Sequence, residues 1–291
     1  MLAFTRLGQC GRLGNQLYQY AALKACCLRH GYECKIPNPA NASWHGQKCL
    51  LDNFNIEADY LTQEDYDGLI TAVCPNEKVG GEYLPILEQV KDNSDLYGFF
   101  QNTKYFDDFR DQIIKELTPK QYLLEKEQKM LSKLRAGGKK IVSLHLRRGD
   151  MTDGTNPTYN KYYGNGPFDT SCIVGNYITN ALNLFNSDEY IILVFSGGSR
   201  SGNDIEDIER AKNVFKEQKF IVSETNDPLR DYTLISQCDH NILSQSSSFG
   251  WWAAYINQTP NKIVVAPKNY HLDDIDPKRR EGFFPSSWKL L

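Results

Sequence analysis

The stretch that decides the fold reads Lys139-Lys140-Ile141-Val142-Ser143-Leu144-His145-Leu146-Arg147-Arg148-Gly149-Asp150. Its apolar residues predict a buried strand that runs directly into two arginines, a glycine and an aspartate. In an open α/β sheet, ligands bind just beyond the carboxyl ends of the strands. A planar guanidinium can hold two phosphate oxygens at once, so the stretch predicts a diphosphate clamp. A salt-bridged surface turn is the alternative that these residues alone leave open.

The residues after this stretch alternate between short apolar runs and amphipathic segments. Strand patterns occur at 141–146, 190–195, 219–223, 240–244 and 262–266, and helix patterns at 171–186, 204–217, 228–237 and 248–257. Helical segments between short apolar runs favour a parallel sheet with right-handed crossovers. The second half of the chain is therefore predicted to be an α/β domain.

A second stretch with chemically useful side chains follows the predicted strand at 240–244. It reads Gln245-Ser246-Ser247-Ser248-Phe249-Gly250 and places three serines where a helix begins. Hydroxyls and the free N–H groups of a helix start form a phosphate-binding arrangement, although ordinary helix capping explains them equally well in isolation. Because two predicted strands of one sheet end in such groups, a phosphate site is favoured.

The first half of the chain has weaker patterns. Strands are predicted at 2–7, 32–36 and 96–100, and helices from residue 15, at 105–117 and at 121–135. The loop before the first helix is spaced G-x-x-G-x-x-G, which differs from the G-x-G-x-x-G of dinucleotide folds. A phosphate loop and a structural turn are both compatible with it. The glycine pair at 137–138 is the predicted boundary between domains 1–137 and 138–291.

Composition places the chain among globular proteins. It has 291 residues, 41% hydrophobic and 24% charged, which suits one large domain or two ordinary ones. A net charge of -3 gives no reason to expect nucleic acid or an anionic membrane as partner. No signal peptide or membrane-spanning run is recognisable. The eight cysteines lack a C-x-x-C spacing and are expected to be reduced thiols in a cytosolic protein.

Metal ligands are not expected from the sequence. The five histidines are scattered, which argues against zinc. Two D-x-D patterns, Asp65-Tyr66-Asp67 and Asp274-Ile275-Asp276, have the spacing by which some glycosyltransferases hold a metal–diphosphate. Neither follows a convincing buried strand.

Four spaced motifs resemble those of the bacterial and animal α-1,2-fucosyltransferases, glycosyltransferase family 11, and the bacterial type fits best. They are Gly11-Arg12-Leu13-Gly14-Asn15-Gln16-Leu17-Tyr18-Gln19-Tyr20-Ala21, Gly98-Phe99-Phe100-Gln101-Asn102-Thr103-Lys104-Tyr105-Phe106, His145-Leu146-Arg147-Arg148-Gly149-Asp150, and Asp239-His240-Asn241 through Trp251-Trp252. The matches run in family order from residue 11 to about residue 258. Four motifs in order make the resemblance specific.

The resemblance implies an α/β fold of the GT-B type, with two Rossmann-like halves facing a central cleft. It implies an acceptor-side domain at 1–137 and a GDP-fucose-binding domain at 138–291, whose tail is free to pack back on the first half. The implied reaction is inverting, metal-independent transfer of L-fucose from GDP-fucose to the 2-hydroxyl of a β-galactoside. A cytoplasmic enzyme without a transmembrane segment, associated peripherally with membrane-linked glycan precursors, is compatible with this.

The resemblance also assigns roles to single residues. Arg147 would hold the β-phosphate, and His145 would line the nucleotide site. The other implied donor-binding residues are Asn15 from the first half, Asp231 for the guanine N–H groups, and Ser247, Ser248 and Phe249 for the phosphates and sugar.

A base for the acceptor hydroxyl is not assigned by the resemblance. Asp150 and Asp153 are the carboxylates close in sequence to the arginines, and Asp150 is equally placed to orient one of them.

Two departures from the family pattern bear on the prediction of acceptor binding more than on that of donor binding. Phe195-Ser196-Gly197-Gly198-Ser199 stands where the family has serine-aspartate-aspartate, and residues 151–168 form a long, tyrosine-rich segment. A binding module that kept the fold without turnover is the rival interpretation. A dinucleotide-dependent oxidoreductase is disfavoured by the glycine spacing and by the absence of a ribose-binding acid.

Overall fold

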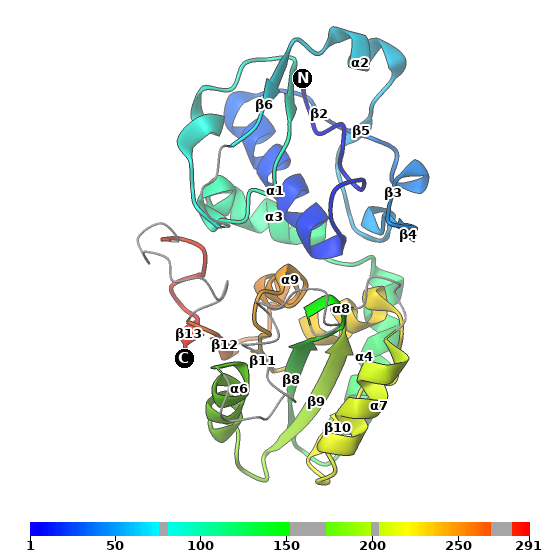
Figure 1. Ribbon diagram of the computed structural model, residues 1–291, viewed down its shortest axis with the longest axis vertical. Helices are drawn as coiled ribbons and strands as arrows, with labels where there is room; N and C mark the ends of the chain where they lie inside the picture. The colour runs from blue at the N-terminus through cyan, green and yellow to red at the C-terminus, as the bar shows by residue number, and fades with distance from the viewer. Residues whose placement is uncertain (76–80, 152–172, 199–203, 269–280) are drawn as a thin grey trace. The chain divides into compact units, whose positions relative to one another are not determined.

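The computed structural model describes residues 1–75, 81–151, 173–198, 204–268 and 281–291. The chain divides into two compact units (Figure 1). The first comprises Met1–Lys120 with Asp274–Ser286, and the second comprises Gln121–Asp273 with Ser287–Leu291. Each unit contains its own parallel sheet, and each is described by itself below.

The second unit is built on a six-stranded sheet in the order β10-β9-β8-β11-β12-β13. All five strand pairings are parallel, and β8 pairs with β9 from Lys140↔Tyr190 to Arg147↔Gly197. The strands are β8 (Lys140–Arg147), β9 (Tyr190–Gly197), β10 (Phe220–Val222), β11 (His240–Ile242), β12 (Val264–Ala266) and β13 (Lys289–Leu290). The predicted parallel sheet is confirmed, and β13 is a strand that the sequence patterns missed.

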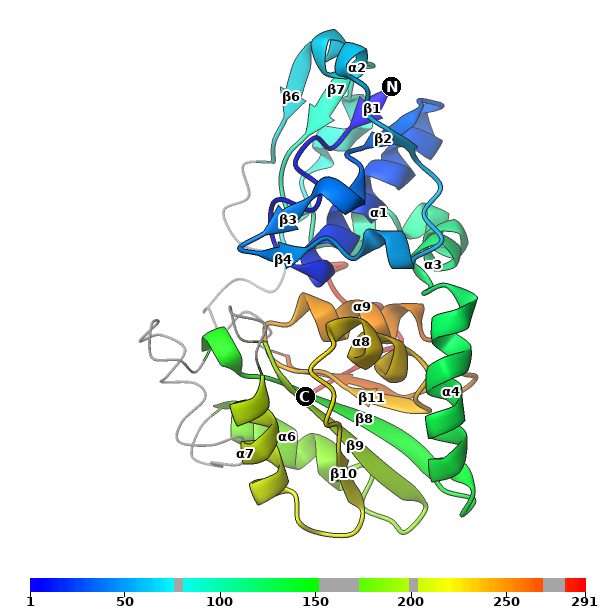
Figure 2. The same cartoon turned by 90° about the vertical axis from the view of Figure 1, so that its right-hand side faces the viewer.

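Helices cover both faces of this sheet (Figure 2). They are α4 (Gln121–Arg135), α6 (Ile173–Asn183), α7 (Ile205–Val214), α8 (Pro228–Ser236) and α9 (Ser248–Ile256), with a short 3-10 turn η6 (Gly149–Met151) after β8. The even-numbered residues of β8, from Val142 to Leu146, share a core with α6 and α7. Because strand side chains alternate, the odd-numbered residues face the other layer, which contains α8 and α9.

The first unit contains a five-stranded sheet in the order β5-β2-β1-β7-β6, also wholly parallel. Its elements include β1 (Leu2–Ala3), α1 (Leu13–His30), β2 (Cys34–Ile36), β3 (Ser43–Trp44), β4 (Gln47–Lys48), β5 (Asp59–Tyr60), α2 (Gln63–Gly68), β6 (Thr71–Val73), β7 (Ser94–Leu96) and α3 (Arg110–Leu117). The predicted strand at 2–7 is shorter than expected, because the chain turns after Ala3 and Leu7 N–H donates to the Phe4 carbonyl at 3.0 Å.

The division between the units falls after Lys120, and the glycine pair predicted as the boundary, Gly137-Gly138, lies inside the second unit. The reason is that α4 packs on the second unit: Glu127 accepts from Arg230 Nε at 2.9 Å. Near the carboxyl end, Glu281 and Gly282 group with the first unit, where the Glu281 carbonyl accepts from Asn102 Nδ2 at 3.1 Å.

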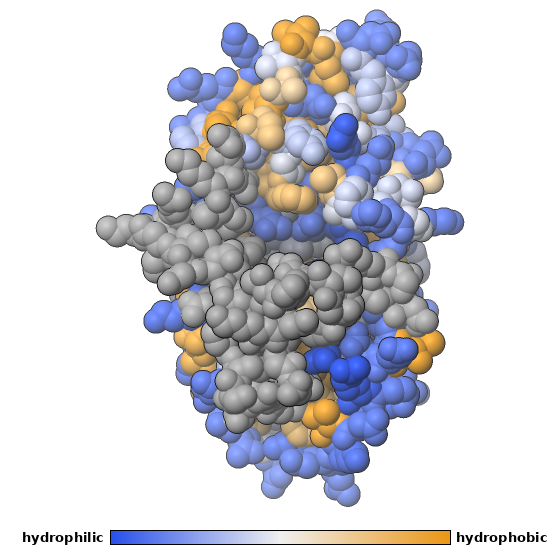
Figure 3. All heavy atoms as spheres, in the orientation of Figure 1, coloured by the Kyte–Doolittle hydropathy of each residue, from blue (hydrophilic) through white to orange (hydrophobic). Residues whose placement is uncertain are grey.

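In the described part of the chain, no helix has both the length and the apolar composition needed to cross a membrane. On the coloured surface in Figure 3, hydrophilic residues predominate over the second unit.

Candidate active site

The strand order of the second sheet locates the candidate site. Numbered along the chain, the order is 3-2-1-4-5-6, so the direction of winding reverses between β8 and β11. In such a sheet, ligands bind in the crevice outside the carboxyl ends of the two strands at the reversal. The segments that follow β8 and β11 are therefore the two sides of the site, and they contain the arginine doublet and the serine turn.

Arg147 ends β8 on the face of the α9 layer, and its backbone connects both sides of the site. Its N–H donates to Ser244 Oγ at 2.7 Å, and Ser244 lies two residues after the end of β11. The side chain passes over Gly198, where an added Cβ would lie 3.3 Å from Arg147 Cδ and from Nε. Gly198 also has φ +110, a conformation that favours glycine. A residue with a side chain at position 198 would crowd the guanidinium.

The segment after β9 supplies a carboxylate that the sequence patterns did not reveal. Asp204 Oδ1 accepts from the Gly198 N–H at 2.9 Å, and a Cβ on Gly197 would lie 2.5 Å from Asp204 Oδ2. Asp204 thus lies at the carboxyl end of β9, beside Gly197 and Gly198. The glycine pair itself was the visible signal, since glycines permit such a close approach.

Arg148 lies on the opposite face from Arg147, as alternation along a strand requires. It is 4% exposed, and its Nε lies 3.4 Å from Asp207 Oδ1 on α7. The other oxygen of Asp207 accepts from the Gly149 N–H at 2.9 Å. The doublet is therefore divided: Arg148 and Asp207 form a buried pair inside the unit, and Arg147 ends β8 at the carboxyl edge of the sheet.

The serine turn caps helix α9. Ser247 is fully buried as its N-cap, and its Oγ accepts from the Gly250 N–H at 3.5 Å. Ser246 before it has φ +48, a left-handed conformation uncommon for serine. Ser248 is the first helical residue and is partly exposed. The capping interpretation is confirmed, and phosphate binding by the N–H groups of this helix start stays a prediction.

His145 lies between the two sides of the site. Burial, assisted by the charge of Arg147, lowers the pKa of His145 to about 3, so the ring is neutral at physiological pH. Its ring centroid lies 5.5 Å from that of Phe249, and its Nδ1 is 2.7 Å from the position of a Cβ built on Gly250. Within the described residues, the buried Nδ1 has no hydrogen-bond partner. Only glycine at position 250 lets α9 approach this ring.

Asp231 is a partly buried carboxyl on α8, next to Tyr232. Its Oδ1 accepts from Ser223 Oγ at 3.1 Å, and its neighbour Tyr232 packs on Phe249 with ring centroids 5.7 Å apart. Burial raises the pKa of Asp231 to about 8, an effect that the hydrogen bond from Ser223 opposes and that the negative charges of Asp227 and Asp204 reinforce. A protonated carboxyl with such a raised pKa can lose its proton when a ligand binds and donates hydrogen bonds to it.

The remaining predicted site residues lie elsewhere or outside the described chain. Asp150 falls in the turn η6, and Asp153 lies outside the described residues. Asn15 is in α1 of the first unit, where its Oδ1 accepts from Gln101 Nε2 at 2.8 Å. This bond connects two of the motifs on which the family resemblance rests.

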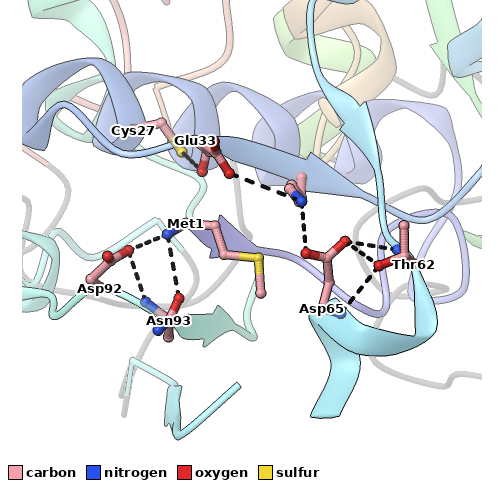
Figure 4. Close-up of polar contacts among 8 residues, drawn as sticks. Met1, Cys27, Glu33, Thr62, Asp65, Asp92 and Asn93 are labelled. Carbon is pink, nitrogen blue, oxygen red and sulfur yellow. Dashed lines mark hydrogen bonds and ion pairs between the residues drawn. The ribbon is translucent and has the colours of Figure 1, made fainter. Parts of the chain in front are cut away.

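The D-x-D patterns do not form a metal centre where they can be described. Asp65 caps α2 together with Thr62 and pairs with Lys35 Nζ at 2.6 Å, as Figure 4 shows in part. The lysine and the Thr62 N–H lower the pKa of Asp65 to about 2. The pattern at 274–276 lies outside the described residues, and within the described ranges no cluster of three or more His, Cys, Asp or Glu side chains is arranged to hold a metal.

Two parallel sheets in separate units, one with an arginine and a helix start at its reversal point, define an α/β protein of the GT-B type. This agrees with solved fucosyltransferase structures that share the fold. Residues 5–291 match the family described as Glycosyl transferase family 11, and the chain belongs to that family. It is therefore a glycosyltransferase, and the fold class expected from the sequence is confirmed.

Several known proteins are similar to this chain. The O-antigen biosynthesis glycosyltransferase WbnK of Escherichia coli is 28% identical over 302 residues, which cover 89% of this chain and 92% of WbnK. Galactoside alpha-(1,2)-fucosyltransferase 1 of Bos taurus is 28% identical over 84% of this chain, which spans only 64% of the bovine protein. The structure of NodZ alpha-1,6-fucosyltransferase soaked with GDP-fucose has a TM-score of 0.54 at 11% identity, covering 91% of this chain and 94% of NodZ. At that identity the likeness concerns the fold alone.

Proposed function

We propose that this enzyme transfers L-fucose from GDP-fucose to the 2-hydroxyl of a terminal galactose, with inversion and without a metal. The observation that carries the proposal is the convergence of Arg147 and the start of α9 at the reversal point of the second sheet. The name of WbnK supports the transfer of a sugar. The name of the bovine relative supports fucose as that sugar, a galactoside as acceptor and the α-1,2 linkage. In this proposal the second unit binds the donor and the first unit binds the acceptor.

The proposed mechanism depends on charge at the leaving group. As the bond to fucose breaks, negative charge grows on the β-phosphate and the sugar becomes oxocarbenium-like. Donors held in place before the reaction stabilise that charge without rearranging. Arg147 supplies a two-pronged donor, and the N–H groups at the start of α9, with Ser247 and Ser248, supply the others. Phe249 then contacts the sugar side of the donor.

The acceptor hydroxyl must lose its proton as it attacks the anomeric carbon. Asp150 and Asp153 follow the clamp in sequence, and the departing phosphate is the third group that can take the proton. Our proposal leaves this choice open among the three. His145, which is neutral and buried, lines the nucleotide site, and Asn15 contributes from the first unit.

The proposed reaction is tested by incubating the purified enzyme with GDP-fucose and lactose. We expect release of GDP together with a fucosylated product whose fucose is α-linked to position 2 of galactose. Activity should persist in excess EDTA, because protein donors provide the positive charge. Activity lost in the chelator and restored by Mg²⁺ would contradict the metal-free mechanism. Binding of GDP-fucose without any transfer to a panel of galactosides would favour the binding module.

A second prediction concerns the proton that Asp231 releases when GDP binds. The guanine N1–H and N2–H groups donate hydrogen bonds that favour the ionised carboxylate, so the pKa of Asp231, about 8 without ligand, should fall when GDP binds. At pH 7 the binding of GDP should therefore release up to about one proton. Calorimetry of GDP binding in phosphate and in Tris buffer measures this release. Asp231→Asn should abolish the release and weaken the preference for GDP over ADP.

The same carboxyl affects the stability of the free enzyme. Because its pKa is raised in the folded state, the contribution of Asp231 to stability is fully present below the ordinary value of 3.8 and is lost as the pH rises through about 8.

The matched control for the proton-release experiment is Asp188, which is exposed at the opposite end of the sheet. Asp188→Asn should leave proton release unchanged. GDP binding by the wild type without proton release at pH 7 would remove Asp231 from the guanine role.

A further inference from the structure

In the first sheet, β1 and β7 lie side by side near the centre of the order β5-β2-β1-β7-β6. In open α/β sheets, ligands bind outside the carboxyl ends of the strands, so the segments that follow these two neighbouring strands are the place to look for a ligand. The first segment begins at Phe4, and the second begins at Tyr97.

Hydrogen bonds hold these two segments in fixed positions. Thr5 donates to Asp95 twice, from N–H to Oδ1 at 2.9 Å and from Oγ1 to Oδ2 at 2.7 Å. Gln19, which is fully buried in α1, donates from Nε2 to the carbonyls of Cys10 and Gly98, each at 3.1 Å. The edge is therefore prearranged, as a binding surface requires.

Two aromatic side chains and an arginine are exposed on these segments. Tyr97 is 40% exposed and Phe99 is 42% exposed, although Phe4 and Phe100 on the same segments are fully buried. Arg6 is exposed, with its Cζ 5.4 Å from the centroid of the Tyr97 ring. Gly98 between the two aromatics has φ +153, and a Cβ there would lie 2.9 Å from Pro75 Cδ. The backbone that presents both rings thus requires a glycine.

The opposite edge of the same sheet is closed by polar contacts. The Met1 amino group pairs with Asp92, and the Ile70 N–H donates to the Asn93 carbonyl at 2.9 Å; Met1, Asp92 and Asn93 are labelled in Figure 4. Exposed aromatic rings beside a cation therefore distinguish the carboxyl edge, where a ligand is expected.

We infer that Arg6, Tyr97 and Phe99 form the platform that binds the terminal galactose of the acceptor. A galactose ring presents one face of C–H groups and a rim of hydroxyls. The aromatic rings suit the C–H face, and the planar guanidinium of Arg6 suits the hydroxyl oxygens. Rigid aromatic side chains give such contacts at a small cost in conformational entropy. The inference rests on the proposed function and specifies where its acceptor binds.

The test compares Tyr97→Ala, Phe99→Ala and Arg6→Ala with the wild type. We expect the KM for lactose to rise roughly tenfold or more in each aromatic variant, with the KM for GDP-fucose unchanged. Saturation-transfer NMR with lactose in the presence of GDP should show weaker transfer to the galactose protons. This second readout measures binding and does not depend on turnover.

Tyr66→Ala provides a matched control. Tyr66 is 41% exposed in the same unit, on α2, which leads to Ile70 at the opposite edge beside Asn93. Its replacement should change neither KM nor the NMR signal. A lactose KM within about twofold of the wild type in both aromatic variants would overturn the platform while leaving the proposed function intact. A wild-type enzyme that transfers fucose to no galactoside would contradict the function itself and, with it, the platform.

Discussion

Arg147→Lys should lower kcat by roughly 10²–10³, because lysine keeps the charge but loses the two-pronged donor to the β-phosphate. Arg147→Ala should lower it further, since the charge is lost as well. Both variants should melt near the wild-type temperature, because the side chain lies at the sheet edge, is only partly buried and contributes little to the core. Steady-state kinetics and thermal melts on the same preparation measure both quantities.

A salt-bridged surface arginine would give the opposite pattern, with a lower melting temperature and nearly intact turnover of the folded enzyme. Gly198→Ala is an independent check, because a Cβ there would lie 3.3 Å from Arg147 Nε in a backbone conformation that disfavours alanine. It should reduce kcat without touching any ligand itself. A folded Arg147→Ala protein that retains about a tenth of wild-type activity or more would exclude the assigned role.

Arg148→Ala should lower the free energy of unfolding of the second unit by about 3–5 kcal/mol, because it leaves the carboxylate of Asp207 without its buried partner. Arg148 is 4% exposed, and the side chain of Asp207 is 13% exposed. Urea denaturation measures the change. The double variant Arg148→Met with Asp207→Leu should recover part of this stability, since both charges are then removed. The recovery should be incomplete, because the Gly149 N–H loses the hydrogen bond that it donates to Asp207.

Lys212 provides the control, because it lies on the same helix as Asp207, is only partly buried, and pairs at 2.9 Å with the exposed carboxylates of Glu209 and Glu224. Lys212→Ala should change the stability little, as exposed pairs are screened by solvent. If Arg148→Ala unfolds at the same urea concentration as the wild type, the buried pair is not what Arg148 contributes. Together, the two arginine variants separate catalysis from stability within one dipeptide.

Much of the second unit could be predicted from local patterns. The helix predicted at 121–135 coincides with α4, and the strands predicted at 141–146 and 190–195 correspond to β8 and β9. Long elements carry enough residues for their periodicity to be recognised. Strands of two or three residues, such as β3, β6 and β13, carry no such signal and depend on their neighbours in the sheet.

The sequence by itself determined that a buried strand ends in two arginines. It also determined that a serine turn starts a helix after another strand of the same sheet. Only the tertiary structure decided that Arg148 meets Asp207 and that Arg147 lies over Gly198. It alone brought Asp204 back to the end of β9 and raised the pKa of Asp231. The physical reason is that periodicity arises from neighbours along the chain, whereas partners and burial depend on residues far apart in sequence.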